Sequence, residues 1–276
     1  MLYRTGRFTR LAEIQAMDPA TEYSAIYRIT ALFDLPSDVR TGLLLGFWRT
    51  FAVPAVAEIL YGTGKSINRT RKRADDTALI IYNLIHHGTN SPEGAEAIRI
   101  MNAIHSRWNI REEDYLYVLG TFIFPQVDWL QRHGWRSLCC HEKESIYLFY
   151  RDIGTRMGIM EIPGTFEEYK SWYIAFEAKN FASTPAGIEL MKGTRDLLNK
   201  MPAWLVPLAQ RMLPALLDEK YRTVVGLEGS PRWATRLLNG LLWVRAKALR
   251  HAAAPRVLPD RADMRRLRRP SSANPS

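Results

Sequence analysis

The sequence predicts an all-α fold, a single large domain built from many helices. Hydrophobic residues make up 47% of the 276 residues, which is enough to bury a substantial core. Between Pro and Gly breaks, apolar residues recur at the three- and four-residue spacing of amphipathic helices. Strands are not expected, because no segment alternates apolar and polar residues for long. No repeat of roughly 20–50 residues is visible, so a solenoid is not expected.

Breaking and capping residues divide the chain into successive helices. Ser37 is expected to cap the first of them, and Ser91-Pro92 opens a later one after a stop at Gly88. Asn109 and Thr165 each precede a glutamate by three residues, which is the spacing of a capping box. With their caps, the expected helices cover residues 37–51, 54–62 or 54–64, 69–87, 91–108, 109–124, 125–133, 140–157, 165–180, 185–199, 203–221 and 231–253.

Four segments differ in character. Residues 1–34 are expected to form an N-terminal arm, and residues 35–230 the main helical domain. Residues 231–254 form a basic amphipathic helix. Residues 255–276 are rich in Arg, Pro and Ser and lack a periodic apolar face, so disorder is expected there.

The net charge of +10 is concentrated near the C-terminus. Residues 245–276 contain nine Lys or Arg and two Asp, so they carry +7 of it. The rest of the chain is close to neutral, and no specific nucleic-acid binding is expected.

The cysteines and the apolar segments indicate in which cellular compartment the protein is expected. Cys139 and Cys140 are adjacent, which suits neither a disulfide framework nor a CxxC metal site and favours a reducing compartment. The first residues lack the sustained apolar stretch of a secretory signal, and no run of about 18 apolar residues predicts a transmembrane helix. The sequence therefore predicts a cytoplasmic protein, with peripheral attachment to the inner membrane face as a further hypothesis.

A chemically suggestive pattern runs from Arg73 to His105. Arg73 and Thr77 are four residues apart, so they share one face of a helix. His105 follows Ile98 and Met101 on a largely apolar stripe. An imidazole, a guanidinium and a hydroxyl beside an apolar interior are groups from which a haem oxygenation site can be built. Spacing alone favours a commoner role for this histidine, a core residue whose nitrogens bind backbone carbonyls.

The arginine has two interpretations as well. Residues 69–77 could be the solvated basic start of a helix, supported by charge pairs. If Arg73 is buried, it needs an acidic or haem-propionate partner, and Glu58 and Asp76 are the acidic candidates.

Other catalytic motifs are missing or incomplete. The segment Gly62-Thr-Gly-Lys-Ser66 lacks the first glycine of a phosphate-binding loop and follows no strand. There is no Glu-x-x-His pair for a di-iron carboxylate bundle and no Gly-x-Ser-x-Gly elbow for a serine hydrolase.

The helix of residues 231–251 is both basic and amphipathic. One broad face carries Trp233, Leu237, Leu241, Val244 and Ala248, continued by Leu238, Leu242 and Leu249. Four cations gather opposite, while Arg245 interrupts the apolar side. Two interpretations stay open: docking on an anionic membrane surface through residues 231–269, or packing on the domain with a solvated basic face.

Two motifs carry a resemblance to a known family. The first is Arg73-x-x-x-Thr77 followed by His105 about one helix later; the second is Tyr147-x-x-Tyr150-Arg-Asp-Ile-Gly154-x-x-Met157-Gly158, followed by Pro163-x-Thr165. In order and spacing, residues 35–220 resemble the haem-dependent oxygenases that comprise the rubber oxygenases (latex clearing proteins) and the fungal MpaB-type enzymes.

The resemblance implies an all-α fold around haem b and assigns roles to residues. His105 resembles the proximal iron ligand, and Arg73 and Thr77 resemble the polar pair on the distal side of the haem. Glu58 stands one residue from the position of an acidic residue proposed as a base. Rubber oxygenases have a lysine directly before the threonine that can cap the iron; Asp76 stands there, so such capping is not expected.

The function predicted from the resemblance is oxygenation of an apolar, unsaturated or isoprenoid-like small molecule, by oxidative C=C cleavage. In that hypothesis His105 holds the iron, Arg73 and Thr77 position oxygen or a propionate, and Glu58 or Asp76 removes a proton. Solid rubber is not the expected substrate, because the sequence shows neither an export signal nor the membrane anchor of the fungal enzyme. The alternative is a non-catalytic helical protein that binds an apolar ligand at membranes.

Overall fold

The structure, a computed structural model, describes residues 8–63, 67–196, 198 and 201–252, without the side chains of 63, 67–75 and 196. No strand occurs in these residues. The helices are α1 (Thr9–Ala16), α2 (Pro19–Ile29), the π-helix η1 (Thr30–Asp34), α3 (Pro36–Arg49), the 3₁₀-helix η2 (Thr50–Ala52), α4 (Pro54–Thr63), α5 (Ile67–His87), α6 (Pro92–His105), α7 (Glu112–Thr121), α8 (Phe124–His133), α9 (Cys140–Arg156), α10 (Phe166–Asn180), α11 (Pro185–Asp196), α12 (Val206–Met212), the 3₁₀-helix η4 (Leu213–Leu216), α13 (Glu219–Val224) and α14 (Arg232–His251). The all-α prediction is confirmed.

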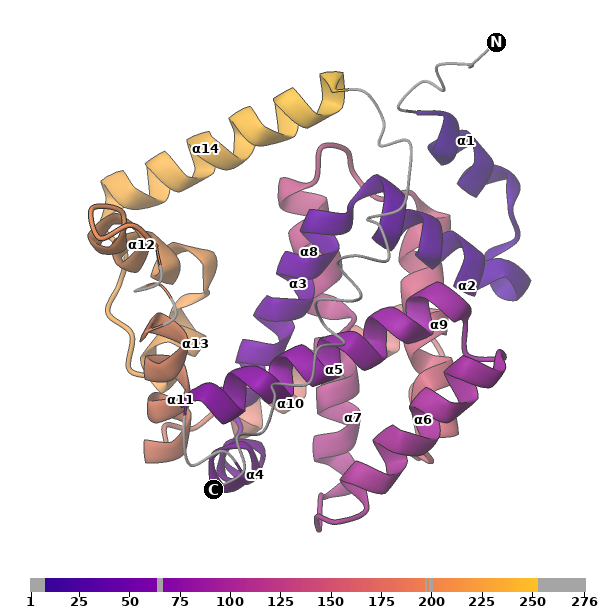
Figure 1. Cartoon of the computed structure of the whole chain (residues 1–276), viewed down its shortest axis with the longest axis horizontal. Helices are drawn as coiled ribbons and strands as arrows, with labels where there is room; N and C mark the ends of the chain where they lie inside the picture. The colour runs from indigo at the N-terminus through magenta and orange to yellow at the C-terminus, as the bar shows by residue number, and fades with distance from the viewer. Residues whose placement is uncertain (1–7, 64–66, 197, 199–200, 253–276) are drawn as a thin grey trace, which may run out of the picture.

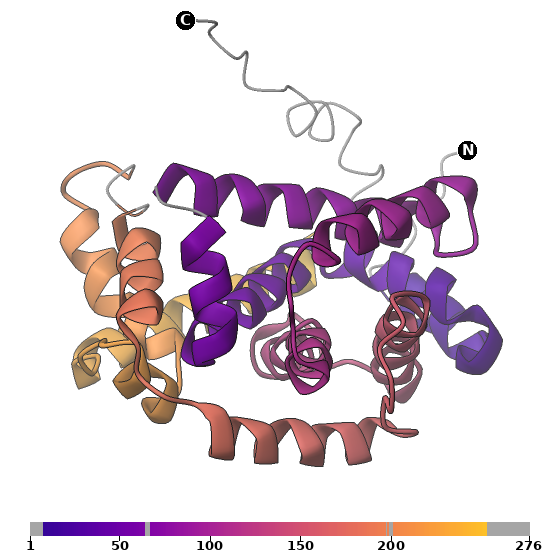
Figure 2. The ribbon, with the colours of Figure 1, turned by 90° about the horizontal axis from the view of Figure 1, so that it is seen from below.

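The helices form layers around a core of aromatic and branched side chains. Figure 2 shows α5 and α6 along one face, α10 along the opposite face, and α7 and α9 end-on between them. Figure 1 shows α14 along an outer edge, beside α12. The core thus lies between α5 and α10, where helices from the first and the second half of the chain meet.

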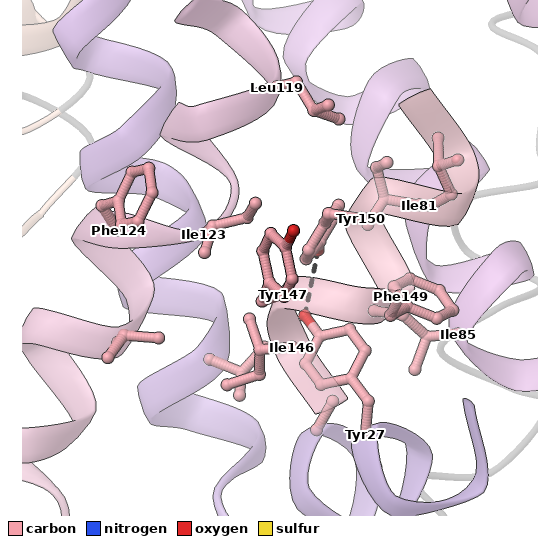
Figure 3. Packing of buried hydrophobic residues seen from close by; sticks show 14 of the residues in the cluster. Tyr27, Ile81, Ile85, Leu119, Ile123, Phe124, Ile146, Tyr147, Phe149 and Tyr150 are labelled. Carbon is pink, nitrogen blue, oxygen red and sulfur yellow. Dashed lines mark hydrogen bonds between the residues drawn. The ribbon is translucent and has the colours of Figure 1, made fainter. Parts of the chain in front are cut away.

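A buried chain of hydrogen bonds crosses this core. The Tyr27 hydroxyl of α2 donates to Gln126 Oε1 of α8 at 2.8 Å. The Tyr150 hydroxyl of α9 lies 2.9 Å from the Tyr27 hydroxyl (Figure 3). Because Tyr27 donates its proton to Gln126, Tyr150 must donate to Tyr27. Burial raises the pKa of both tyrosines, so both hydroxyls remain protonated donors.

The segment first described as an arm, residues 1–34, is helical and packed from residue 9 onward. Ile14, Ile26 and Tyr27 are fully buried, and α2 packs along α9. The sequence led us to expect an arm without helices here; in the structure, α2 is interrupted at Glu22, whose backbone is not helical.

The π-helix η1 places a buried ionic cluster at the end of this segment. Arg136 donates to Asp34 Oδ2 at 2.5 and 3.0 Å and to both oxygens of Glu142 at 2.6 and 2.7 Å. Thr30 adds a hydrogen bond to Glu142 Oε1 at 2.8 Å. Burial raises the pKa of Asp34, although Arg136 opposes this. The cluster ties η1 to the start of α9, where Glu142 also accepts from the Cys139 backbone N–H.

Helix α3 closely approaches α8 and the end of α7 at two glycines. Gly42 faces Gln126, and Gly46 faces the carbonyl of Thr121 so closely that a Cβ at either position would clash. The two glycines are one turn apart, so they form a continuous strip on α3 against which α8 and the end of α7 lie.

Three predicted helix boundaries were wrong. The first helix begins at Pro36 after Leu35 rather than with a Ser37 cap, because proline suits the first helical position. The capping box at Asn109 does not form: Arg111 precedes α7 and pairs with Asp114 instead. The single helix expected over 203–221 is broken into α12, η4 and α13, because Asp218 caps a new helix by accepting from Tyr221 N at 2.9 Å.

No single helix in the described ranges is long and apolar enough to cross a membrane. Residues 36–52 and 54–62 reach the length and apolar composition of a membrane span only when they are taken together, and the two segments meet at a bend of 101°.

Candidate functional site

The predicted site residues other than Glu58 lie on the hairpin of α5 and α6. Gly88, with a φ of +80°, ends α5, and the Ser91 hydroxyl caps α6 by accepting from Gly94 N at 2.9 Å. The same hydroxyl donates to the Gly88 carbonyl at 2.9 Å, so one side chain fixes both ends of the turn. The Ser91 cap and the Gly88 stop were both predicted correctly. Figure 1 shows the two helices diverging from this turn, with α7 behind them.

His105 is the last residue of α6, on the face that the helix buries. Ala97, Ile98 and Met101 of that face belong to the core, and the half-buried His105 continues their stripe. Its Nδ1 lies 2.7 Å from the Met101 carbonyl oxygen. A carbonyl only accepts, so Nδ1 donates its proton in this contact. The imidazole ring also contacts Tyr115 of α7, with ring centres 5.7 Å apart.

This ring fits an iron ligand in its chemistry. Metal-bound histidines typically donate their second ring N–H to a carbonyl or carboxylate, which fixes the tautomer and the ring plane. Among the described residues no three His, Cys, Asp or Glu side chains lie together as a metal site. A haem iron needs only one protein ligand of this kind on the proximal side, since the porphyrin supplies the others around it.

The remaining candidates lie on α5 and α4. Thr77 is half-buried on α5, one turn before the core residue Ile81. Thr77 precedes His87 by ten residues and Asn102 follows Pro92 by ten, so the hairpin brings Thr77 and the end of α6 to similar heights.

Two of the acidic and basic candidates are not drawn into the interior. Asp76 on α5 and Glu58 on α4 are both exposed, and α4 packs mainly on α11 and η2. The side chain of Arg73 lies outside the described residues, although its backbone is part of α5. Thr77 and His105 therefore lie on the two helices of one hairpin, whereas Glu58 lies outside it on α4.

The comparisons with known proteins decide the family. The model of the ER-bound oxygenase mpaB/B'/rubber oxygenase catalytic domain matches residues 37–251. The chain belongs to this family. The match covers α3 to α14 and therefore includes the whole candidate site.

Relatives and a solved structure agree with this membership. The ER-bound oxygenase mpaB' of Penicillium brevicompactum is 25% identical over 93% of this chain and 68% of its own length. The ER-bound oxygenase mpaB of Penicillium roqueforti is 23% identical over 80% of this chain and 85% of its own length. Latex clearing protein LCP, solved in its closed state, superposes with a TM-score of 0.60 at 14% identity, covering 93% of this chain and 75% of that chain, and so shares the fold. The chain is an oxidoreductase of the oxygenase class, as its family implies.

The second family motif, on α9 and after it, serves packing. The Tyr147 hydroxyl donates to the Pro163 carbonyl at 2.6 Å, and Tyr150 belongs to the buried chain with Tyr27. Gly154 leaves room for Leu119 of α7, and Gly158 adopts a φ of +79° that favours glycine. This motif thus fixes α9 against α7 and the loop before α10.

Sequence reasoning missed two partners of the candidate ligand. The Met101 carbonyl is a backbone group, and no side-chain pattern marks it. Tyr115 could have been found, because it stands one turn inside a helix that follows His105 closely. A tyrosine ring beside an imidazole restricts the ring orientation further.

A second polar centre, away from the hairpin, was not predicted at all. Arg49 of α3 binds both oxygens of Glu177 on α10, at 2.5 and 2.6 Å, and Asp218 at 2.5 Å. Tyr117 donates to Glu177 Oε1 at 3.0 Å. Burial lowers the pKa of Arg49, but Glu177, Tyr173 and Tyr117 together raise it overall, so the guanidinium stays charged. This cluster holds α3, α10 and the cap of α13 together.

Proposed function

We propose that this chain is a haem b oxygenase whose apolar, unsaturated or isoprenoid-like substrate is cleaved at a C=C bond. The observation that carries the proposal is the orientation of His105, whose Nδ1 donates to the Met101 carbonyl in a chain of the oxygenase family. Nε2 of that ring is the atom that would hold the iron. When bound, haem supplies the activation of O₂ or peroxide.

The protein residues have separate tasks in this proposal. Met101 and Tyr115 orient the imidazole. Thr77, on the neighbouring helix, offers a hydroxyl that can orient a polar atom of the oxidant or a propionate, and Arg73 is assigned the same task. The apolar residues of α5 and α6 exclude water from the surroundings of an apolar substrate.

Removal of a substrate proton needs an acidic side chain close to the reacting carbon. Glu58 and Asp76 are the two candidates, and both are exposed in the described structure. Two single variants, Glu58→Gln and Asp76→Asn, separate them: the variant of the base loses turnover by about a hundredfold or more and keeps its haem.

The decisive experiment compares two histidines of one hairpin. Protein expressed with a haem precursor is purified as wild type, as His105→Ala and as His87→Ala, a matched control because His87 is exposed at the end of α5. A stoichiometric Soret band is expected in wild type and in His87→Ala and should be lost or strongly reduced in His105→Ala.

Turnover is measured in the same three proteins, with an isoprenoid alkene such as squalene and detection of carbonyl products. Full haem and full activity in His105→Ala would show that another residue holds the iron. A wild type that stays colourless after haem is added would overturn the haem proposal and favour a non-catalytic apolar-ligand protein.

A further inference from the structure

Helix α14 buries only half of its apolar surface. Leu238, Leu242 and Leu249 face the domain, and Leu242 packs against a buried cluster that includes Leu45, Trp129 and Leu213. Arg245, which interrupts the apolar side in the sequence, reaches Asp38 with contacts of 2.8 and 3.1 Å. Asp38 is almost fully buried and also accepts from Trp129. This ion pair fixes the rotation of α14 about its axis.

With that rotation, the other half of the apolar surface points to solvent. Trp233, Leu237, Leu241 and Val244 follow each other at helical spacing and are 50, 40, 53 and 57% exposed. No described residue covers this strip, which we call the outer strip of α14. Its continuity along one helix distinguishes it from the scattered apolar residues that any protein surface shows.

Cations line one side of the outer strip. By helical position, Arg236 and Lys247 border it, and Arg232 and Arg250 lie one step further round the helix. No Asp or Glu occurs between Arg232 and His251. An exposed apolar strip with a purely basic border is typical of helices that lie in the interface of an anionic bilayer.

A basic hollow adjoins the same helix. It has a volume of about 460 Å³ and lies between α14 and the end of α8. Its lining holds four basic side chains and two tryptophans but no acidic residue: Arg132, His133, Lys247, Arg250, Trp135 and Trp243. Its size and charge suit a phosphate-bearing headgroup beside the helix.

We propose that α14 docks this protein on an anionic phospholipid bilayer, with the outer strip among the acyl chains and the basic border and hollow at the headgroups. A second copy of the chain fits less well, because two outer strips in contact would bring two basic borders together without any acidic partner on α14. The proposal is independent of the haem and of the reaction, since it uses none of the residues of the α5–α6 hairpin.

The test is vesicle co-sedimentation of the full chain, with phosphatidylcholine vesicles with or without phosphatidylglycerol. Wild type is expected to bind the anionic vesicles about tenfold more tightly than the neutral ones, and high salt should weaken this binding. Residues 256–269 also carry cations, so salt sensitivity alone does not identify α14.

The variant that identifies α14 is Leu237→Ser combined with Leu241→Ser. Both side chains are exposed, so the fold should be preserved, which circular dichroism and melting verify. Binding to anionic vesicles should fall about tenfold or more. The matched control is Ile174→Ser with Lys179→Gln, an exposed apolar residue and an exposed cation on α10, and it should bind like wild type.

Unchanged binding of the Leu237/Leu241 variant, or no binding of wild type, would overturn the proposal. A wild type that ignores vesicles but forms a dimer, which the leucine variant dissociates, would assign the outer strip to a second copy instead. The spectrum and turnover of the leucine variant in detergent should match wild type, so failure of the haem proposal and failure of docking remain distinguishable.

Discussion

At the scale of single residues, charged groups far apart in the sequence decide how helices join. Arg49 meets Glu177 and Asp218 across 128 and 169 positions. No local pattern marks such a triad, because each residue looks like an ordinary exposed charge in its own helix. His105 could be singled out from the sequence only because it stands on an apolar stripe, while the partner of its Nδ1 is a backbone carbonyl.

Asp218 offers a test of the charge itself. Burial raises its pKa, but the charge and hydrogen bond of Arg49 outweigh this and hold the pKa below its usual range. A carboxylate of this kind stabilises the fold above its unfolded pKa of about 4, and the stabilisation is lost as pH falls through the lowered folded pKa. Asp218→Asn keeps the cap of α13 and should cost about 0.5–1 kcal/mol at pH 7, since the side chain is partly exposed.

Denaturant melts of wild type and Asp218→Asn at pH 7 and at pH 3 measure this effect. The difference between the two proteins should shrink at the lower pH, and a constant difference would refute the electrostatic explanation. Asp218→Ala removes the cap as well, and it should cost about 1 kcal/mol more than Asp218→Asn at both pH values.

At the scale of elements, the positions of helices along the chain can be predicted from local capping signals. The contacts between helices cannot be predicted in this way. Pro54, Gly88, Ser91 and Thr165 each begin or end a helix as predicted, because capping acts through neighbours within one turn. The break inside residues 203–221 was missed, because the cap at Asp218 was not recognised in the sequence. The amphipathic pattern of α14 was visible in the sequence, whereas which half of it is covered depends on the pairing of Arg245 with Asp38.

The close contact of α3 with the end of α7 predicts unequal effects of two glycine substitutions. Gly46→Ala introduces a methyl group against the backbone of Thr121, which cannot move aside without shifting α7, so the cost should be about 1–3 kcal/mol or more. Gly240→Ala, in the exposed middle of α14 with open space around it, should stabilise by up to about 1 kcal/mol. Chemical denaturation compares the two, and equal effects would contradict the close approach of the helices.

At the scale of the whole molecule, residues from both halves of the chain form the core. The first described helices lie against α9, and the family match begins only at residue 37. A fully buried tyrosine of α2 completes a hydrogen-bond chain with α8 and α9. The general fold class and the family could be predicted from composition and motif order, but the burial of residues 9–34 could not, since it depends on contacts more than a hundred residues away.

Deleting each end of the chain tests this picture. Removal of residues 1–34 uncovers the core face of α9 and removes Asp34 from Arg136, so the product should lose cooperative unfolding or become insoluble. Removal of residues 255–276, for which the sequence predicts disorder, should leave the melting temperature unchanged. Calorimetry of both truncations measures the outcome, and an unchanged melting temperature after removal of residues 1–34 would contradict the packing described for α2.

Because of the π-helix η1, the fold depends on the number of residues between Thr30 and Asp34. Such a turn holds one residue more than a regular α-helical turn. Deletion of any one residue between Thr30 and Asp34 would therefore rotate every preceding helical residue by about 100°. Tyr27 would then turn away from Tyr150, although no side chain of the core had been altered. Single substitutions can therefore be tolerated in residues 30–34, whereas insertions and deletions have to occur in the loops.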